Sequence, residues 1–296
     1  MAVLTTPRSN VELASKGRPV KETAFRLALL ASLAIALIFL VALLAYVFIE
    51  GSPRLDSRLW SNMPSIRDPE IAGAQSAITG TLWVISLTAL FTIPTGIAAA
   101  IYLEEYANTS KWYNRVIELN IQNLAAIPSI VYGILGLGII ARTFGLGFSV
   151  ITASLTLGLL VLPIVIIAAR EAIRSVPPSI REGSLALGAT QWQTISRQVL
   201  PASIPGIATG SILALSRAIG EAAPLLMLGA VSFIRFNPDG VFASYTVLPI
   251  QIFNWIAQSR EGFHILASAA IVILLAILLL MNSVAIWLRN RYQRRW

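Results

Sequence analysis

The chain has 296 residues, of which 56% are hydrophobic and only 12% charged, and its mean hydropathy is +0.75. This composition excludes a soluble globular protein. The formal net charge of +8 does not indicate nucleic-acid binding, because the basic residues flank apolar runs, where they set membrane topology. With no cysteine and one histidine, the chain cannot form a disulfide framework, a thiolate site or a histidine metal cluster.

The apolar runs predict an all-α integral membrane protein. Residues 1–24 are polar and are interpreted as a cytosolic N-terminal tail. The first apolar run is too long for a cleaved signal peptide. Each run is close to the roughly 20 residues that a helix needs to cross a bilayer. The sequence therefore predicts six transmembrane helices, over residues 25–48, 77–102, 121–140, 148–169, 206–231 and 263–288.

The distribution of basic residues predicts which connecting segments face the cytosol. Arginine and lysine are concentrated in the tail, in the segment over 170–203 and in the basic C-terminus over 289–296. Fewer occur in the segments over 50–71 and 232–261. By the positive-inside rule, both termini and the 170–203 loop are cytosolic. Glu104 and Glu105 are expected in water at the end of the second span.

The 170–203 loop starts with signals for a short helix. Pro177 and Pro178 stop the helix of the preceding span. The pattern Ser179-Ile-Arg-Glu182 is typical of a capping box and predicts a helix that begins there. Gly188 predicts a left-handed end to that helix.

A second short helix is predicted directly after Gly188. Thr190-Gln-Trp-Gln193 is another capping-box pattern, and Trp192, Ile195 and Val199 share a face at helical spacing. Pro201 is expected to end this helix. Two short helices broken at a glycine form a knob against which another protein can push. An ordinary amphipathic connector is the alternative interpretation.

The spacing of this loop resembles the EAA loop of ABC importer permeases. Three departures from that pattern are Gly183, Ser184 and Gln198, where the family has alanine, alanine and isoleucine. The resemblance implies a coupling element, including Trp192, that sits in a groove of a cytosolic ATPase subunit. The residues in register with the family pattern are Glu182, Gly188, Leu200 and Pro201.

One basic residue lies inside a predicted span. Arg217 is followed one turn later, on the same helix face, by Glu221. A charge at membrane depth costs about 2.5–3.5 kcal/mol on insertion scales, so it must face protein, water or another charge. A guanidinium suits an oxyanion such as phosphate. The pair is therefore a candidate for the transport pathway, and a purely structural ion pair is the alternative.

The same span carries small residues at every fourth position, which permits close helix packing. This stripe can contact a partner permease or pack within the same subunit, and the sequence leaves both possibilities open. Pro224 is expected to bend the helix near the charged pair. The residues of the stripe are Gly206, Gly210, Ala214, Ala218 and Ala222.

Several stretches resemble the phosphate-specific permeases of ABC importers: SRAIGEAAPLL, AAIPSIVYGILGLG and TVLPIQIFNW. The resemblance implies a type I, MetI-like bundle in the bacterial cytoplasmic (inner) membrane, with short cytosolic coupling helices. It also implies phosphate translocation, with Arg217 and Glu221 in the pathway. Where the family often has an arginine, this chain has Ile167, and Arg170 one turn later is the candidate replacement.

The resemblance also implies the partners. These are a PstC-like permease, two PstB-like ATPase subunits and an external phosphate-binding protein, with lipid around the spans. ATP and magnesium would be bound by the ATPase, since this chain has no Walker A pattern. An enzyme is not expected, because no nucleophile–base pair or metal set is evident. Two alternatives are a permease for sulfate or molybdate and an ion-coupled secondary carrier.

Overall fold

A computed structural model describes residues 19–108, 110–229 and 233–292, so most of the predicted tail and the last four residues lie outside it. The described residues form helices joined by connections of varied length. Five of these helices are long and apolar enough to cross a membrane, or six if one sharply bent pair counts as a single span. The described part of the chain therefore fits the predicted all-α membrane fold. It divides between Tyr46 and Val47 into two units.

The first unit is the greater part of helix α1 (Pro19–Gly51). Its side chains from Lys21 to Tyr46 are exposed, and large apolar ones such as Phe39 point outward on all sides. A helix that is apolar all round and uncovered within its own unit suits a lipid or protein environment.

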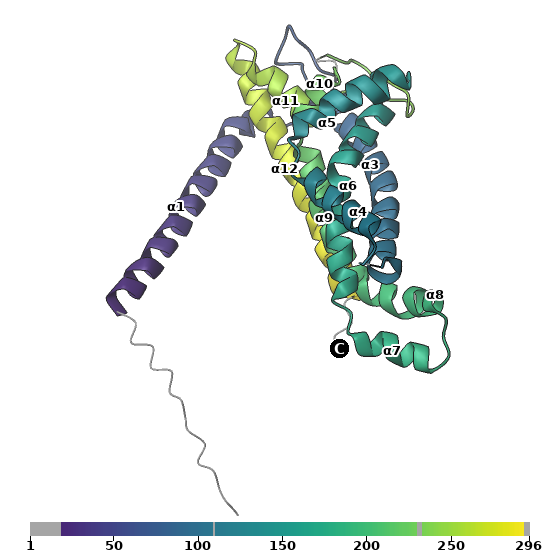
Figure 1. Ribbon diagram of the computed structural model, residues 1–296. Helices are drawn as coiled ribbons and strands as arrows, with labels where there is room; N and C mark the ends of the chain where they lie inside the picture. Colours follow the sequence, from purple (N-terminus) through teal and green to yellow (C-terminus); the bar gives the residue numbers. More distant parts are fainter. Residues whose placement is uncertain (1–18, 109, 230–232, 293–296) are drawn as a thin grey trace, which may run out of the picture. The chain divides into compact units, whose positions relative to one another are not determined.

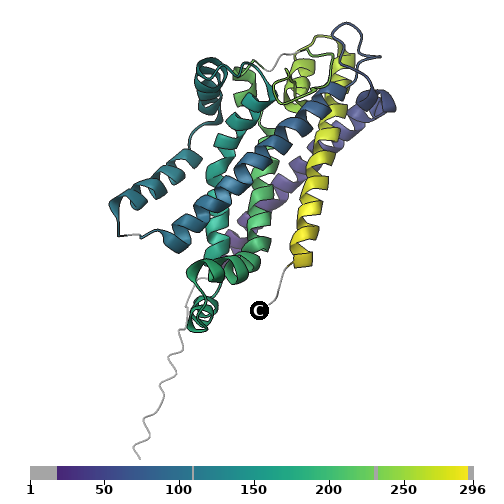
Figure 2. The same ribbon diagram turned by 90° about the vertical axis from the view of Figure 1, so that its right-hand side faces the viewer.

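The second unit is built on four long helices that run side by side (Figures 1 and 2). Helix α6 is the most buried of the candidate spans and packs between α3 and α9, and α12 packs on α9. The core at their centre includes Val161 and Ala214. The bounds of these helices are α3 Gln75–Ile101, α6 Val150–Arg174, α9 Leu200–Gly220 and α12 Glu261–Tyr292.

The small-residue stripe of α9 packs within the subunit. A Cβ added at Gly206 would lie 2.7 Å from the Cβ of Ala172, and one at Gly210 would lie 2.3 Å from the Cβ of Ala168. Only glycine permits this approach of α9 to α6. Farther along, Ala214 is buried as well. The sequence left open whether this stripe contacts a partner permease or packs within the subunit. The structure shows packing within the subunit, against α6.

The third predicted span is broken. The sequence predicts a continuous helix over 121–140, but α4 (Trp112–Ala125) is separated from α5 (Ser129–Leu135) by a bend of 106°. Pro128 is the N-cap of α5. Proline disfavours helical geometry in the residue before it and lacks the N–H needed to continue the helix. The π-helical segment η3 (Gly136–Thr143) extends α5.

At one end of the bundle, residues 178–199 form the predicted knob (Figures 1 and 2). It contains α7 (Pro178–Ala186), α8 (Gln191–Thr194) and the π-helical segment η4 (Ile195–Val199). Gly188 separates the helices with a φ of +85°, which confirms the predicted left-handed position. The capping box of Thr190 is also confirmed, with both reciprocal hydrogen bonds present.

Two details predicted for the knob are wrong. Helix α7 is not capped by Ser179: it begins at Pro178, which occupies the first turn, where a missing N–H costs nothing. Pro201 does not end the second helix, because α8, η4 and α9 run on as one helix over Gln191–Gly220. A proline in the first turn of α9 is tolerated because the π-helical turn before it already interrupts the regular hydrogen bonds.

The opposite end of the bundle carries shorter elements: η1 (Ser52–Arg54), α2 (Ser57–Ser61), α10 (Ala223–Met227) and α11 (Leu248–Ile256). Arg54 donates to the backbone carbonyls of Glu70 at 2.9 Å and Ala72 at 2.8 Å and thereby holds the loop after α2. The span predicted over 206–231 ends earlier than expected, because α9 ends at Gly220.

Candidate functional site

The predicted ion pair in α9 is present and loose. Arg217 lies in the last turn of the helix, and its Nε is 3.7 Å from Oε1 of Glu221. This distance is too long for a hydrogen bond. The side chain of Arg217 is half exposed, and that of Glu221 is 19% exposed. Among the described residues, Glu221 is the one polar partner of this guanidinium, so most of its N–H groups are available to a ligand.

A break in the helix places the pair at a helix end. Helix α9 ends at Gly220, and Glu221 has an extended ψ of 111°. The short helix α10 then begins with Pro224 in its first turn, consistent with the bend expected from that proline. A cation in the last turn is favoured by the helix dipole. The hydroxyl of Ser216 donates to Oδ1 of Asn282 at 2.7 Å, which fixes this end of α9 against α12.

Arg170 does not share this location. The contacts of Gly210 with Ala168 set an antiparallel register in which Arg217 lies level with about Val161 of α6. Arg170 is nine residues farther along α6, which corresponds to roughly 14 Å at the rise of an α-helix. The structure therefore brings Arg217 and Glu221 together and places Arg170 nearer the knob.

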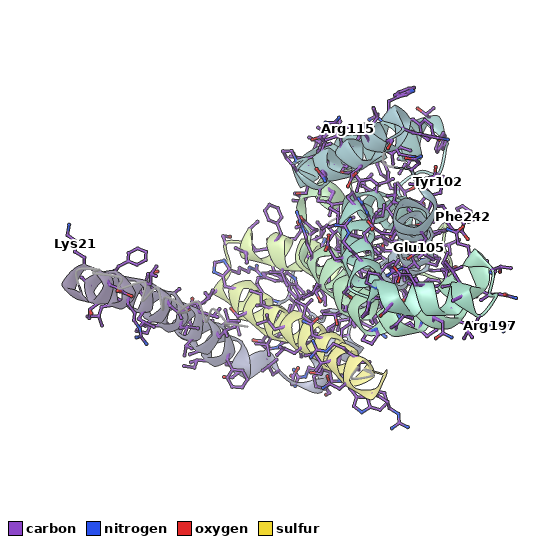
Figure 3. The ribbon with its side chains drawn as sticks, turned by 60° about the horizontal axis from the view of Figure 1, so that its bottom comes forward. Lys21, Tyr102, Glu105, Arg115, Arg197 and Phe242 are labelled. Atoms are coloured by element: carbon purple, nitrogen blue, oxygen red, sulfur yellow. The ribbon has the colours of Figure 1, made fainter. Side chains whose placement is uncertain are left out.

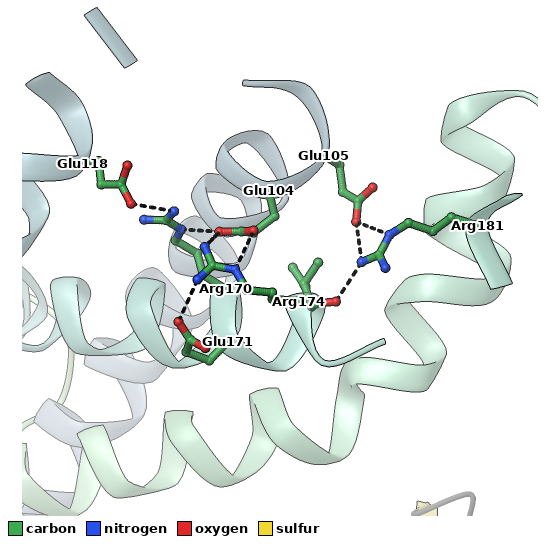
Figure 4. Close-up of polar contacts among 8 residues, drawn as sticks. Glu104, Glu105, Glu118, Arg170, Glu171, Arg174 and Arg181 are labelled. Carbon is green, nitrogen blue, oxygen red and sulfur yellow. Dashed lines mark hydrogen bonds and ion pairs between the residues drawn. The ribbon is translucent and has the colours of Figure 1, made fainter. Parts of the chain in front are cut away.

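Arg170 is held by two carboxylates. Its Nε donates to Oε1 of Glu104 at 2.7 Å, and its Nη2 donates to Oε1 of Glu118 at 2.9 Å. Arg170 is buried, and Arg174 also donates to Glu104 at 2.8 Å. Figure 4 shows these side chains converging from α4, α6 and the π-helical segment η2 (Tyr102–Tyr106), which follows α3. A guanidinium neutralised in this way is not a free anion-binding group.

This ion cluster at the knob end was missed by the sequence analysis. Glu104 and Glu105 were expected in water, but their side chains are only 13% and 10% exposed. Both lie in the π-helical segment η2 at the end of the second span. Arg181 of α7 donates to Glu105 through Nε and Nη2 (Figure 4). The sequence does hold a signal for this cluster: Glu104 and Glu105 end one apolar run, and Arg170 and Arg174 end another, so ion pairs between the two helix ends could be expected.

The knob presents its own residues outward. Glu182 is exposed, and Trp192 is 58% exposed. Leu187, next to Gly188, is 91% exposed and was not singled out from the sequence. Pro201 is exposed and Leu200 is partly buried, since both lie where the helix enters the bundle. Predicted coupling residues therefore occur both at the free tip and at the base of the knob.

A groove of about 440 Å³ runs between α7 and the segment formed by α8 and η4. Ile180 and Leu187 contribute apolar surface to it, and Gln193 and Arg197 contribute polar groups. In Figure 3, which brings the knob end forward, Arg197 lies at the outer edge of the knob, far from Arg115 of α4. The knob thus combines apolar tips with a polar groove, which suits contact with another protein.

Comparison with known proteins gives consistent matches. Residues 92–296 match the model of a family described as the binding-protein-dependent transport system inner membrane component. The chain is 31% identical over 267 residues to the probable ABC transporter permease protein YqgI of Bacillus subtilis, covering 86% of this chain and 90% of that protein. It is 32% identical over 267 residues to the phosphate transport system permease protein PstA 1 of Mycobacterium tuberculosis, covering 89% and 87%.

Solved structures share the fold at low sequence identity. A bacterial alginate ABC transporter in complex with an alginate-bound periplasmic protein matches with a TM-score of 0.68 and 17% identity, over 93% of this chain and 96% of that one. An inward-facing MetNI methionine ABC transporter matches with a TM-score of 0.60 and 17% identity, over 74% and 97%. At this identity the likeness concerns the arrangement of helices.

Proposed function

The chain belongs to the binding-protein-dependent transport system inner membrane components, and on that basis we propose that it is the permease subunit of an ATP-driven importer of inorganic phosphate. Relatives named as phosphate transport permeases, at about a third identity over most of both chains, support the substrate. The chain itself acts as a transport subunit and not as an enzyme.

The observation that carries the proposal is the state of Arg217. It is a half-exposed guanidinium in a membrane span, and Glu221, 3.7 Å away, is its one partner among the residues that the structure describes. Arg170, in contrast, is paired with two carboxylates, which neutralise its charge. An arginine keeps its charge at any physiological pH and can donate two parallel hydrogen bonds to phosphate oxygens. Glu221 then neutralises Arg217 when no anion is bound.

Because half of the Arg217 side chain is exposed, residues of another subunit are needed to enclose the transport pathway on that side. One guanidinium with open surface beside it does not enclose an anion, so a second permease subunit, PstC-like in the family arrangement, completes the path. An external binding protein delivers phosphate at the end that carries α10 and α11. Two PstB-like ATPase subunits bind ATP with Mg²⁺ and press on the knob through residues that include Trp192 and Leu187.

This arrangement sets the orientation in the bacterial inner membrane. Residues 170–203 form the cytosolic coupling loop, with Glu182 and Gly188 in the knob and Leu200 and Pro201 at its base. Residues 1–24 and 289–296 are cytosolic, and the six spans lie between them. The concentration of arginine and lysine in these segments supports the assignment.

The test is phosphate uptake by the complete transporter after Arg217→Gln. Because a hydrogen bond to a charged group is worth about 1.5–3 kcal/mol, uptake should fall roughly 10- to 150-fold while the complex still assembles. Arg142→Gln is the matched control, since Arg142 is an exposed arginine at another helix end and its loss should leave uptake unchanged. Normal uptake by the Arg217→Gln transporter would remove this residue from the pathway.

Competition with unlabelled anions tests the substrate in the same assay. Excess phosphate should suppress uptake of labelled phosphate, and equal amounts of sulfate or molybdate should not. Suppression by sulfate or molybdate would assign the permease to another oxyanion. Uptake that persists without any ATPase subunit would instead indicate a secondary carrier.

A further inference from the structure

The knob is attached to the end of α3 through a single residue. Arg181 of α7 donates to Oε1 of Glu105 through Nε at 3.1 Å and Nη2 at 2.9 Å. Gln191 of α8 donates to the backbone carbonyl of Glu105 at 2.6 Å. Among the described residues, the hydrogen bonds from the knob to η2 all end on Glu105. Two helices of the knob therefore bind the same residue of η2, the segment that continues α3.

Arg181 also binds the end of α6. Its Nη1 donates to the carbonyl of Val176 at 2.6 Å, and its Nη2 donates to the carbonyl of Ile173 at 2.8 Å. The carbonyl of Ile173 also accepts from the N–H of Val176 at 3.2 Å, whereas the carbonyl of Val176 lies just past the end of the helix and gains its partner from this arginine. One side chain thus joins α7, the end of α6 and the end of α3 (Figure 4). The side chains of Arg181 and Glu105 are only 23% and 10% exposed.

The knob on one side of this joint is itself held together. The hydroxyls of Ser184 in α7 and Thr194 in α8 are 2.9 Å apart and hydrogen-bonded. The capping box of Thr190 fixes the start of α8. On the other side of the joint, Glu104 adjoins Glu105 and is bound by Arg170 and Arg174 of α6. A displacement of the knob is therefore passed to α3 and α6 and is not absorbed between them.

We infer that Arg181 and Glu105 form a joint that stays closed through the transport cycle and carries displacement of the knob to α3. The inference rests on the proposed coupling of the knob to an ATPase. Both are positioning residues, because they touch neither phosphate nor ATP. The wide contact of α3 with α6, and of α6 with α9, then extends the movement to the helix that bears Arg217.

The first test compares phosphate uptake with ATP hydrolysis in the purified, reconstituted transporter. Arg181→Lys keeps the charge but loses the fork that spans Glu105 and the two carbonyls. The ATPase subunits should still copurify, while phosphate moved per ATP should fall by about 5- to 150-fold, the range of coupling between two sites. Glu105→Gln should do the same. Arg115→Gln is the control, because Arg115 of α4 is exposed, lies outside the knob and has no ion pair among the described residues.

A ratio of phosphate to ATP equal to that of the wild type in Arg181→Lys and Glu105→Gln would overturn the inference. A merely structural role would lower the yield of the complex but leave the ratio per complex unchanged. If the proposed function itself were wrong, the wild-type transporter would show no ATP-dependent phosphate uptake. The two failures are therefore distinguishable.

A second test asks whether the joint opens. The chain has no cysteine, so Glu105→Cys with Arg181→Cys gives one unique thiol pair in it. Without a linker this variant should lose phosphate moved per ATP as the single variants do. Bridging the thiols with a short bifunctional reagent, verified by mass spectrometry, should restore the ratio. A bridged transporter that hydrolyses ATP but no longer moves phosphate would show that the joint must open, and would refute the inference.

Discussion

The contact between Gly210 of α9 and Ala168 of α6 provides a direct test of the helix register. A Cβ at position 210 would lie 2.3 Å from the Cβ of Ala168, whereas carbon atoms pack at about 3.5–4.0 Å. Gly210→Ala therefore requires the two helices to separate by roughly 1.2–1.7 Å at this point. Overpacking of this kind costs about 1–3 kcal/mol.

Helix propensity works in the opposite direction. Alanine is favoured over glycine in a helix by up to about 1 kcal/mol, so the single variant alone understates the clash. Ala168→Gly removes the opposing Cβ and loses the same propensity. In the double variant the propensity terms cancel and the clash is absent. The double variant should therefore be more stable than the sum of the single effects by about 1–3 kcal/mol.

The assay is the thermal midpoint of the purified transporter in detergent for all four combinations. At about 2–4 °C per kcal/mol, the departure from additivity is expected to be roughly 2–12 °C. Gly138→Ala is the control, because nothing lies within 4 Å of a Cβ at that position. Strict additivity, with no loss in Gly210→Ala, would show that α6 and α9 do not meet at these residues and would refute the packing described here.

Two further predictions concern a turn and a buried hydroxyl. Gly188→Val places a β-branched side chain at a φ of +85°, which should cost about 1–2 kcal/mol of local strain and lower phosphate uptake. Gly183→Ala in the adjacent helix is the control and should keep normal uptake, because nothing lies within 4 Å of a Cβ at that position. Equal uptake by the two variants would contradict a need for the left-handed turn. The hydroxyl of Tyr245 is buried and has no hydrogen-bond partner among the described residues, and burial raises the pKa of Tyr245. Tyr245→Phe should keep or raise the thermal midpoint, since an unpaired buried group costs about 1–3 kcal/mol, and a clear drop would reveal a partner that the structure lacks.

Local signals in the sequence were sufficient wherever the physical cause is local. Long apolar runs predicted the spans because burying backbone polar groups in lipid requires a helix. Gly188 and Thr190 predicted a left-handed turn and a helix start, and both are confirmed. Arg217 and Glu221 are four residues apart, so their pairing also follows from helix geometry.

Local signals failed where a neighbouring element competed with them. Pro201 was expected to end a helix, but a π-helical turn before it lets α8 continue into α9. Pro128 is a different case, because there the local signal favours the observed break: the residue before a proline avoids helical geometry, and the predicted continuous span over 121–140 was wrong.

The sequence alone determined the membrane class, the approximate spans, the knob and the isolated charge in the fifth span, because each depends on composition or on residues a few positions apart. The tertiary structure alone decided how charges that lie far apart in the chain are paired. Glu104 lies 66 residues from Arg170 in the chain, and Glu105 lies 76 residues from Arg181. Their pairing arises only when α3, α6 and α7 meet, because an ion pair depends on distance in space. That meeting separates Arg170, which is neutralised beside the knob, from Arg217, which is half exposed beside Glu221.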